Sequence, residues 1–348
     1  MRRRANQAIT TAMDLGLNRL GAAATEAQRR AWWSAMFMLI LSSIDHETPP
    51  INSLGDQRIT TPYPSFHNQP ELWPLLLQAG AAILSVSQTL RNHNAHSTVE
   101  PSSSSNISAK ITQLDSNLSK LTRKLDRSPQ LESGISVDTQ GLRTMWAIAQ
   151  ALAYSARVRL HRVRVFTDIP LYINNHCDLI SYQETRNPSQ TLSSGIFTSS
   201  VFPFTEAQSS LICLKASLAM VRAYERVAIF AEGGPTVTSR ATTTPPQAHI
   251  VLPFFMCGAM QASYVLLITH YRLQVSLRSK DQGSTYSHLL HHPEPGFEVQ
   301  DTERLLRELR QGIDSVLRVV RLATMFEGIR GMGEEIQAAY HGVCAGDF

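Results

Sequence analysis

Residues Ile250 to Thr269 read IVLPFFMCGAMQASYVLLIT, and this stretch decides the fold class. No Asp, Glu, Lys or Arg occurs from Ala241 to Tyr271, and the run is long enough to cross a bilayer as one helix. The centre of a large helical domain needs the same pattern, because a helix that is apolar on every side must be buried. Pro253 near the start and Gln261 and Tyr264 in the middle favour the buried central helix. A membrane-associated protein anchored by residues 250–269 is the alternative.

Apolar residues at helical spacing continue on both sides of this stretch. They predict helices near residues 5–20, 26–44, 70–90, 111–125, 142–160, 205–232 and 305–323. Polar segments rich in Pro, Ser or Gly separate the helices, and we expect flexible or loop-rich inserts at 92–108 and 167–204. Strands do not alternate with helices in the pattern, which excludes a parallel sheet. The sequence therefore predicts an all-α fold: one domain over residues 1–348, with about nine to twelve helices packed around the central apolar helix.

Local motifs mark two of the helix starts. The spacing of a capping box occurs twice, at Thr25 with Gln28 and at Thr205 with Gln208. In this motif the Thr side chain accepts a hydrogen bond from an amide of the first helical turn, and the Gln side chain accepts one from the amide of the Thr. The large aromatic side chains of Trp32, Trp33 and Trp146 fall on apolar helix faces. We interpret all three as core residues rather than ligand contacts.

The apolar residues from Ile111 to Leu125 alternate at three and four positions, as in an a/d seam. The seam covers little more than two heptads, whereas a coiled coil needs about three to four. A core helix that docks on its neighbours is therefore favoured over a dimerisation zipper. Association with a second copy, or with a different protein, through this seam is the alternative.

Two basic patterns are interpreted as solvated surface. The first ends a helix and consists of Arg157, Arg159, His161, Arg162 and Arg164. Such side chains complement the dipole of a last helical turn, and no aromatic residues are interleaved with them, as single-stranded nucleic acid would need. The second pattern, Arg304 to Arg321, alternates with acids such as Glu303 and Asp314. No DNA-binding residue is predicted from either pattern.

Residues that could carry chemistry are scarce. No phosphate loop, dinucleotide fingerprint, nucleophile elbow or HExxH pair occurs, so we predict that the protein is not an enzyme and assign no catalytic or metal residue. General acid–base catalysis could use the side chains of Asp45, His46 and Glu47. Three adjacent side chains, however, cannot converge on one substrate.

One metal-like cluster occurs in the sequence. It consists of His288, His291, His292, Glu294 and Glu298. Pro293 and Pro295 favour a solvated loop over a metal site there. A helical metal-dependent enzyme that uses the His288 cluster is the alternative.

Composition bounds the class of protein. The chain has 348 residues, of which 43% are apolar and 17% charged, as in a packed globule. The net charge of +4 cannot by itself indicate nucleic acid or membrane as a partner. Four widely spaced cysteines indicate a reducing compartment. Arg2, Arg3 and Arg4 superficially resemble the start of a transit peptide, but an ordinary amphipathic helix is favoured.

Several segments, taken in order, resemble the fungal-specific transcription factor domain. This domain, also called the middle homology region, is the regulatory part of fungal zinc binuclear cluster regulators. The first four segments are Met13–Arg19 (MDLGLNR), Gln28–Ser34 (QRRAWWS), Pro49–Ile51 (PPI) and Ile59–Pro64 (ITTPYP). Later segments similar to the family are Leu160–Arg162, Phe202–Phe204, Pro253–Phe255 and Met325–Ile329. Asn18 stands where the family usually has His.

The resemblance implies a regulator of transcription in the nucleus; without the resemblance we would expect the cytoplasm. It implies action through a protein partner, a homo- or heterodimer, or a small-molecule effector, and no membrane. The family reads DNA through an N-terminal zinc cluster built from six closely spaced cysteines, which four isolated cysteines cannot form. We therefore expect a partial regulatory domain without its own zinc cluster, no zinc in these residues, and contact with DNA only indirectly or through that module.

Overall fold

The computed structural model describes residues 2–44, 49–65, 69–96, 104–127, 137–166, 169, 202–231, 253–279, 298–322 and 327–345. Within these residues the chain forms nine α-helices, two short 3-10 turns and no strand, so the all-α prediction is confirmed. The chain divides into two compact units: unit 1 is Met1–Leu160 with Cys177–Pro203, and unit 2 is His161–His176 with Phe204–Phe348. One domain over residues 1–348 stays a prediction, because two compact units can belong to one domain.

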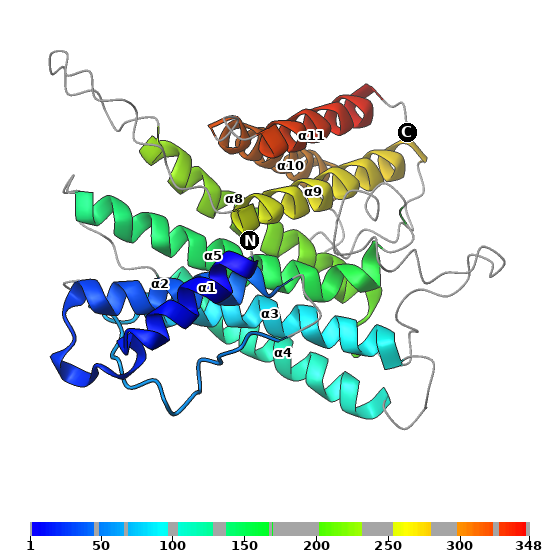
Figure 1. Cartoon of the computed structure of the whole chain (residues 1–348). Coiled ribbons are helices and arrows are strands. Elements are labelled where there is room, and N and C mark those ends of the chain that lie inside the picture. The colour runs from blue at the N-terminus through cyan, green and yellow to red at the C-terminus, as the bar shows by residue number, and fades with distance from the viewer. Residues whose placement is uncertain are drawn as a thin grey trace, which may run out of the picture. The chain divides into compact units, whose positions relative to one another are not determined.

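Unit 1 begins with α1 (Arg2–Asp14), followed by the 3-10 turns η1 (Leu17–Arg19) and η2 (Gly21–Ala23). It continues with α2 (Glu26–Ser42), α3 (Leu72–His96), α4 (Ser104–Asp126) and α5 (Val137–Val165), whose last residues belong to unit 2. Helix α1 packs on α2, α2 on α3, and α3 on α4 (Figure 1). Gly80 allows α3 to approach α2 closely, because a Cβ atom there would lie 3.3 Å from Cγ2 of Ile40.

Unit 2 contains α8 (Glu206–Ala231), α9 (Pro253–Ser279), α10 (Glu298–Leu322) and α11 (Glu327–Ala345). Helix α9 packs against α8, α10 and α11, which in Figure 1 surround it within this unit. From Phe255 to His270 every residue of α9 is buried except Cys257, which is half-buried. The central buried helix is therefore confirmed for the described part of 250–269. None of the described helices is both long and apolar enough to cross a bilayer.

Both capping boxes form at the predicted helix starts. At α2 the amide of Thr25 donates to Oε1 of Gln28 at 2.9 Å, and the amide of Gln28 donates to Oγ1 of Thr25 at 3.3 Å. At α8 the corresponding distances between Thr205 and Gln208 are 2.9 and 3.1 Å. These motifs could be predicted because the groups that satisfy the first amides of a helix lie within four residues of each other.

The predicted insert at 92–108 is helical at both ends, in contrast to our expectation. Helix α3 continues to His96 and α4 begins at Ser104, so only residues 97–103 lie outside the described chain. A polar segment can extend an existing helix, because adding a residue to a formed helix costs far less than starting one. The predicted insert at 167–204 is described only at Ile169 and Phe202–Phe204, none of which is helical.

Candidate functional site

The candidate site lies where η1 meets the connection between α2 and α3. We call residues 56–65 the strap. Gly16, with φ of +69°, adopts the left-handed conformation that turns the chain from α1 into η1. The backbone amides of Thr60 and Thr61 both donate to the carbonyl oxygen of Asn18, at 2.8 and 3.2 Å. The strap is therefore joined to η1 by main-chain hydrogen bonds between segments about forty residues apart.

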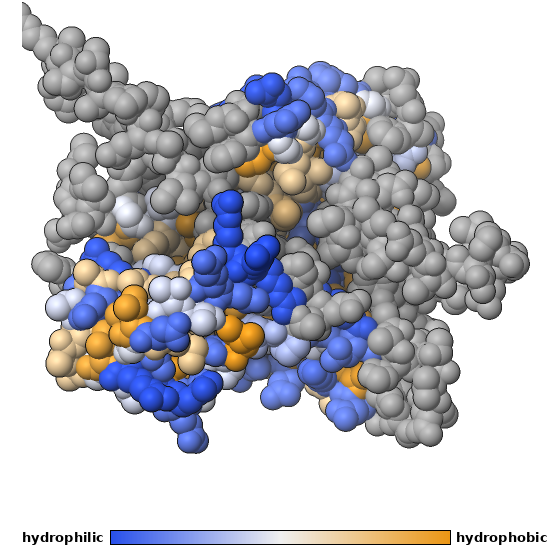
Figure 2. All heavy atoms as spheres, viewed as in Figure 1, coloured by the Kyte–Doolittle hydropathy of each residue, from blue (hydrophilic) through white to orange (hydrophobic). Residues whose placement is uncertain are grey.

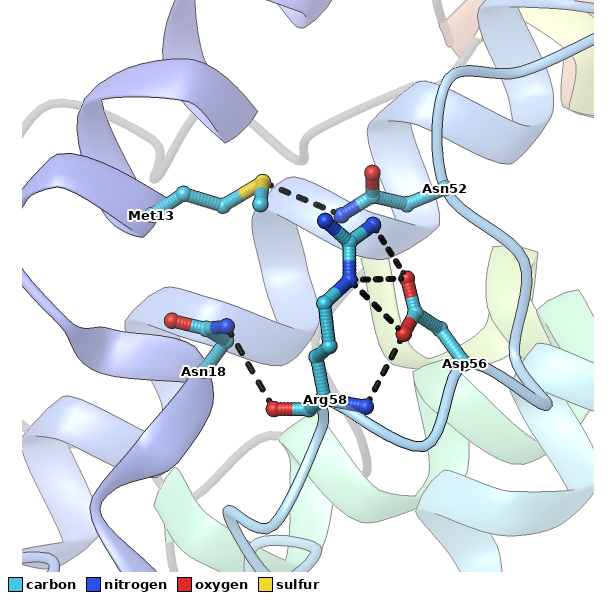
Figure 3. Close-up of polar contacts among 5 residues, drawn as sticks. All are labelled: Met13, Asn18, Asn52, Asp56 and Arg58. Atoms are coloured by element: carbon cyan, nitrogen blue, oxygen red, sulfur yellow. Dashed lines mark hydrogen bonds and ion pairs between the residues drawn. The ribbon is translucent and has the colours of Figure 1, made fainter.

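Thr61 and Asn18 add side-chain bonds to this junction. The hydroxyl of Thr61 donates to the carbonyl of Leu17 at 2.6 Å and accepts from the amide of Leu20 at 3.1 Å. Nδ2 of Asn18 donates to the carbonyl of Arg58 at 3.4 Å (Figure 3). Both side chains are 3% exposed, which is tolerable for polar groups because they are hydrogen-bonded.

The strap then crosses the first turns of α2. Nε1 of Trp33 donates to the carbonyl of Pro62 at 3.0 Å, and the ring of Tyr63 stacks on that of Trp33 with centroids 4.2 Å apart. The amide of Ser65 donates to Oε2 of Glu26 at 3.3 Å. Oε1 of the same carboxylate accepts from Nε of Arg30 at 2.9 Å. An aromatic pair and a charged pair thus hold the end of the strap.

An ion pair shapes the start of the strap. The guanidinium of Arg58 contacts the carboxylate of Asp56 at 2.7 to 3.1 Å, and the amide of Arg58 donates to Oδ1 at 2.9 Å (Figure 3). These hydrogen bonds lower the pKa of Asp56 to about 2, and the pair raises the pKa of Arg58. A carboxylate this acidic, with both oxygens engaged, is suited to fixing a turn rather than to transferring protons near neutral pH.

Residues 49–52 lie against α1. Nη2 of Arg2 donates to the carbonyl of Pro49 at 3.4 Å, and Nδ2 of Asn52 donates to Sδ of Met13 at 3.2 Å (Figure 3). Hydrophilic residues cover the first turns of α1 beside the N-terminus (Figure 2). Leu15 and Ile51 are large apolar side chains that remain exposed, at 68% and 53%.

The three tryptophans predicted as core residues are buried, which confirms that prediction. Trp32, Trp33 and Trp146 are 0%, 3% and 7% exposed. Nε1 of Trp146 donates to the carbonyl of Leu125 at 2.9 Å, which joins α5 to the end of α4.

The seam on α4 faces other helices of the same chain. Ile111, Leu118, Leu121 and Leu125 are buried, and Leu114 is half-buried. Helix α4 packs on α3 and is hydrogen-bonded to α5. The seam is therefore covered within the chain, as expected for a core helix, and association through it stays a prediction.

The basic cluster at the end of α5 is not solvated surface, and that prediction is wrong. Arg159, His161 and Arg162 are 3%, 0% and 1% exposed, while Arg157 and Arg164 are half-buried. Within unit 1, Nη1 of Arg159 donates to Oγ of Ser87 at 2.5 Å. Within unit 2, Nδ1 of His161 lies 3.2 Å from Oγ of Ser209. The interpretation failed because the burial of a helix end depends on its neighbours in space.

The arginines of α10 do lie in solvent, as predicted. Arg304, Arg307, Arg310, Arg318 and Arg321 are all exposed. Glu308 contacts Arg222 of α8 at 3.6 Å, so at least one acid of this face pairs across helices.

Metal-ligating side chains do not gather in the part of the chain that the structure describes. His288, His291, His292 and Glu294 lie outside the described residues, and only the backbone of Glu298, the first residue of α10, is described. Asp45, His46 and Glu47 also lie outside them. The metal and acid–base alternatives therefore stay predictions.

Sequence reasoning missed the junction of η1 with the strap. Its bonds use backbone groups and two neutral side chains, Asn18 and Thr61, which give no periodic signal. The spacing of Asp56 and Arg58, two residues apart after Gly55, could have indicated a turn closed by an ion pair.

Comparisons with known proteins give no match. No protein-family model matches the chain. Searches among curated proteins and among solved structures give no match either.

Proposed function

We propose that this chain is a regulatory domain of a fungal transcription regulator. In this proposal it acts in the nucleus through contacts with a protein partner, which can be a second copy, or with a small-molecule effector. It has no zinc cluster of its own among these residues and reaches DNA through another module or partner. The proposal rests on the resemblance to the middle homology region, and an all-α fold is compatible with it.

One spatial observation carries the proposal. The four segments that first carry the resemblance, 13–19, 28–34, 49–51 and 59–64, are in contact with one another or with their immediate neighbours. Asn18 accepts from Thr60 and Thr61, Trp33 donates to Pro62, and Met13 accepts from Asn52. The meeting of these segments supports a single structural module.

The strap offers a mechanism for regulation by population shift. It is joined to η1 and α2 by a small number of hydrogen bonds, so its release costs far less than unfolding the unit. A partner or effector that binds better to one arrangement of the strap shifts the population toward it. The differential contacts would involve Tyr63, which is 38% exposed and is the outer member of the stack on Trp33.

A tethering experiment tests this function. The whole chain is fused to an unrelated DNA-binding module, and transcription of a reporter with the matching site is measured in fungal cells. We expect the fusion to raise or lower reporter transcription relative to the module alone. Nuclear fluorescence of the fusion checks its location. A fusion that is folded and nuclear but leaves transcription unchanged would show that the proposed function is wrong.

Variants of neighbouring threonines locate the regulatory part. Thr61→Val removes two buried hydrogen bonds, whereas Thr60→Val alters an exposed side chain of the same strap. We expect Thr61→Val to change the regulation and Thr60→Val to preserve it. Thermal melting of both purified variants separates displacement of the strap from general unfolding. Equal regulation by the two variants would exclude the strap from the mechanism.

A further inference from the structure

The exposed side of α4 carries cations that form no ion pair with the residues that the structure describes. Lys110, Lys120 and Lys124 on α4, and Arg127 directly after its last residue, are all exposed, and we call these four residues the α4 basic face. At 100° per residue, the three lysines fall within an arc of about 80° around the helix. Helix α4 lies at the lower edge of the view in Figure 1, with α3 on its inner side.

The acids of α4 point to the other side of the helix. Oδ1 of Asp115 lies 3.1 Å from Nε of Arg157 on α5. Both carboxylate oxygens of Asp126 accept from the hydroxyl of Tyr154 on α5, at 2.6 and 2.7 Å. None of the four cations of the α4 basic face forms an ion pair within the described chain. The sequence alternates charges here, but the folded surface is basic.

The exposed surface of α10, by contrast, carries acids among its arginines. Glu303, Glu308 and Asp314 are exposed among its arginines, and Glu308 is paired with Arg222. The α4 basic face has no exposed acid within its arc. Its intervening exposed residues include Gln113 and Asn117, whose amide groups commonly donate to phosphate oxygens.

The side chains of the α4 basic face indicate which kind of polyanion it can bind. The apolar side of α4 is buried against α3 and α5, so no apolar surface is available to enter a bilayer. No aromatic residue occurs on α4 to stack on unpaired bases. Large apolar side chains, which anchor protein partners, are absent from the exposed arc. What remains is a row of three lysines about 21 Å long on one helix, a length over which one DNA strand presents about six phosphates.

We propose that the α4 basic face binds the phosphate backbone of double-stranded DNA without reading its bases. This contact goes beyond the proposed regulatory function and does not depend on it. Such binding is electrostatic, so the association constant falls as salt displaces the protein from the phosphates. Duplex DNA of any sequence is expected to bind with similar affinity.

Fluorescence anisotropy with a labelled 30-base-pair duplex, between 20 and 150 mM KCl, tests the proposal. We expect weak binding, with a slope of log K against log salt of about −3 to −4 if three or four phosphates are contacted. The triple variant Lys110→Gln, Lys120→Gln, Lys124→Gln should bind at least about tenfold more weakly at low salt, with a slope shallower by about 2 to 3. Circular dichroism melts confirm that the variants are folded.

A matched variant distinguishes the effect of the α4 basic face on DNA binding from the effect of net charge. Arg304→Gln, Arg307→Gln, Arg318→Gln removes the same three charges from α10, and we expect it to bind DNA within about twofold of the parent. If both triple variants lost the same affinity for DNA, net charge would explain the effect, and the proposal would be overturned. So would the absence of binding by the parent at 20 mM KCl. Tighter binding to single strands, to duplex RNA or to vesicles of 30% phosphatidylserine in phosphatidylcholine would also overturn it.

Discussion

Nε1 of Trp33 donates a hydrogen bond to the carbonyl oxygen of Pro62, 3.0 Å away, and so fastens the strap to α2. Tyr63, the next residue of the strap, stacks on the same indole with ring centroids 4.2 Å apart. Trp33 is therefore a core residue that also positions a surface segment. Its hydrogen bond and its ring make separable contributions, which substitutions can distinguish.

Replacing Trp33 with Phe should lower the free energy of unfolding by about 1 to 2 kcal/mol, because the carbonyl of Pro62 loses its donor while most of the ring remains. Replacing Trp33 with Ala should lower the free energy of unfolding by about 3 to 5 kcal/mol. Urea denaturation measures both. Trp73→Phe is the control, since Nε1 of Trp73 is buried and has no hydrogen-bond partner among the described residues, so its loss leaves none of their acceptors unsatisfied. If Trp73→Phe lowered the free energy of unfolding more than Trp33→Phe does, the stabilising role given to the Trp33–Pro62 hydrogen bond would be contradicted.

The ion pair of Asp56 and Arg58 predicts a pH dependence in acid. The pKa of Asp56 falls from an ordinary 3.8 to about 2 in the folded chain, so the unfolded chain binds its proton first. The contribution to stability is complete above about pH 4 and is lost as the pH falls toward 2. The difference in melting temperature between the parent and Asp56→Asn should therefore shrink over this range. A difference that stays constant would show that the pair does not form.

His270 predicts a second pH dependence, nearer neutrality. The side chain is fully buried on α9, and its Nε2 accepts from Nε of Arg310 on α10 at 3.0 Å. Burial, with a further effect of Arg310, lowers the pKa of His270 from 6.5 to about 4. Between these values the unfolded chain binds a proton that the folded chain does not, so stability falls as the pH is lowered from about 6.5 to 4.

The protonation of His270 should lower the free energy of unfolding by about 1 to 3 kcal/mol at pH 4. Urea midpoints of the parent and of His270→Gln, measured from pH 7 to pH 4.5, check it. Gln cannot take up this proton, so the variant should lose less stability than the parent over the same interval. His341→Gln, at an exposed position on α11, should retain the parent's dependence. Parallel curves for the parent and His270→Gln would contradict the prediction.

Leu118 tests whether the α4 seam serves the fold or an oligomer. The side chain is 1% exposed within a single chain, so Leu118→Asp should place an unpaired charge in the core. We expect the free energy of unfolding to fall by about 4 kcal/mol or more. Asn117→Asp adds the same charge at an exposed neighbour and should have little effect. A folded Leu118→Asp variant that elutes as a smaller species in size-exclusion chromatography would instead support the zipper.

Local signals account for the parts of the fold that the sequence predicted. Thr25 with Gln28 and Thr205 with Gln208 contain both partners of a cap within four residues, and the structure forms both. The polar segment at 92–108 misled the sequence interpretation, because polarity excludes burial but does not exclude an exposed helical turn. The junction of Asn18 with the strap could not be predicted, since no short-range pattern links groups so far apart.

Helix periodicity, capping and apolar runs are properties of neighbouring residues, so the all-α class, the starts of α2 and α8 and the burial of α9 could be predicted without the structure. The burial of the basic cluster at the end of α5 and the pairing of the α4 acids depend on the tertiary structure. Arg159 and Arg162 are buried, and Asp115 and Asp126 bind side chains of α5, so neither acid pairs with the α4 basic face in the part of the chain that the structure describes. Charge compensation depends on helices that are distant in sequence, and for that reason only the folded chain has a basic face.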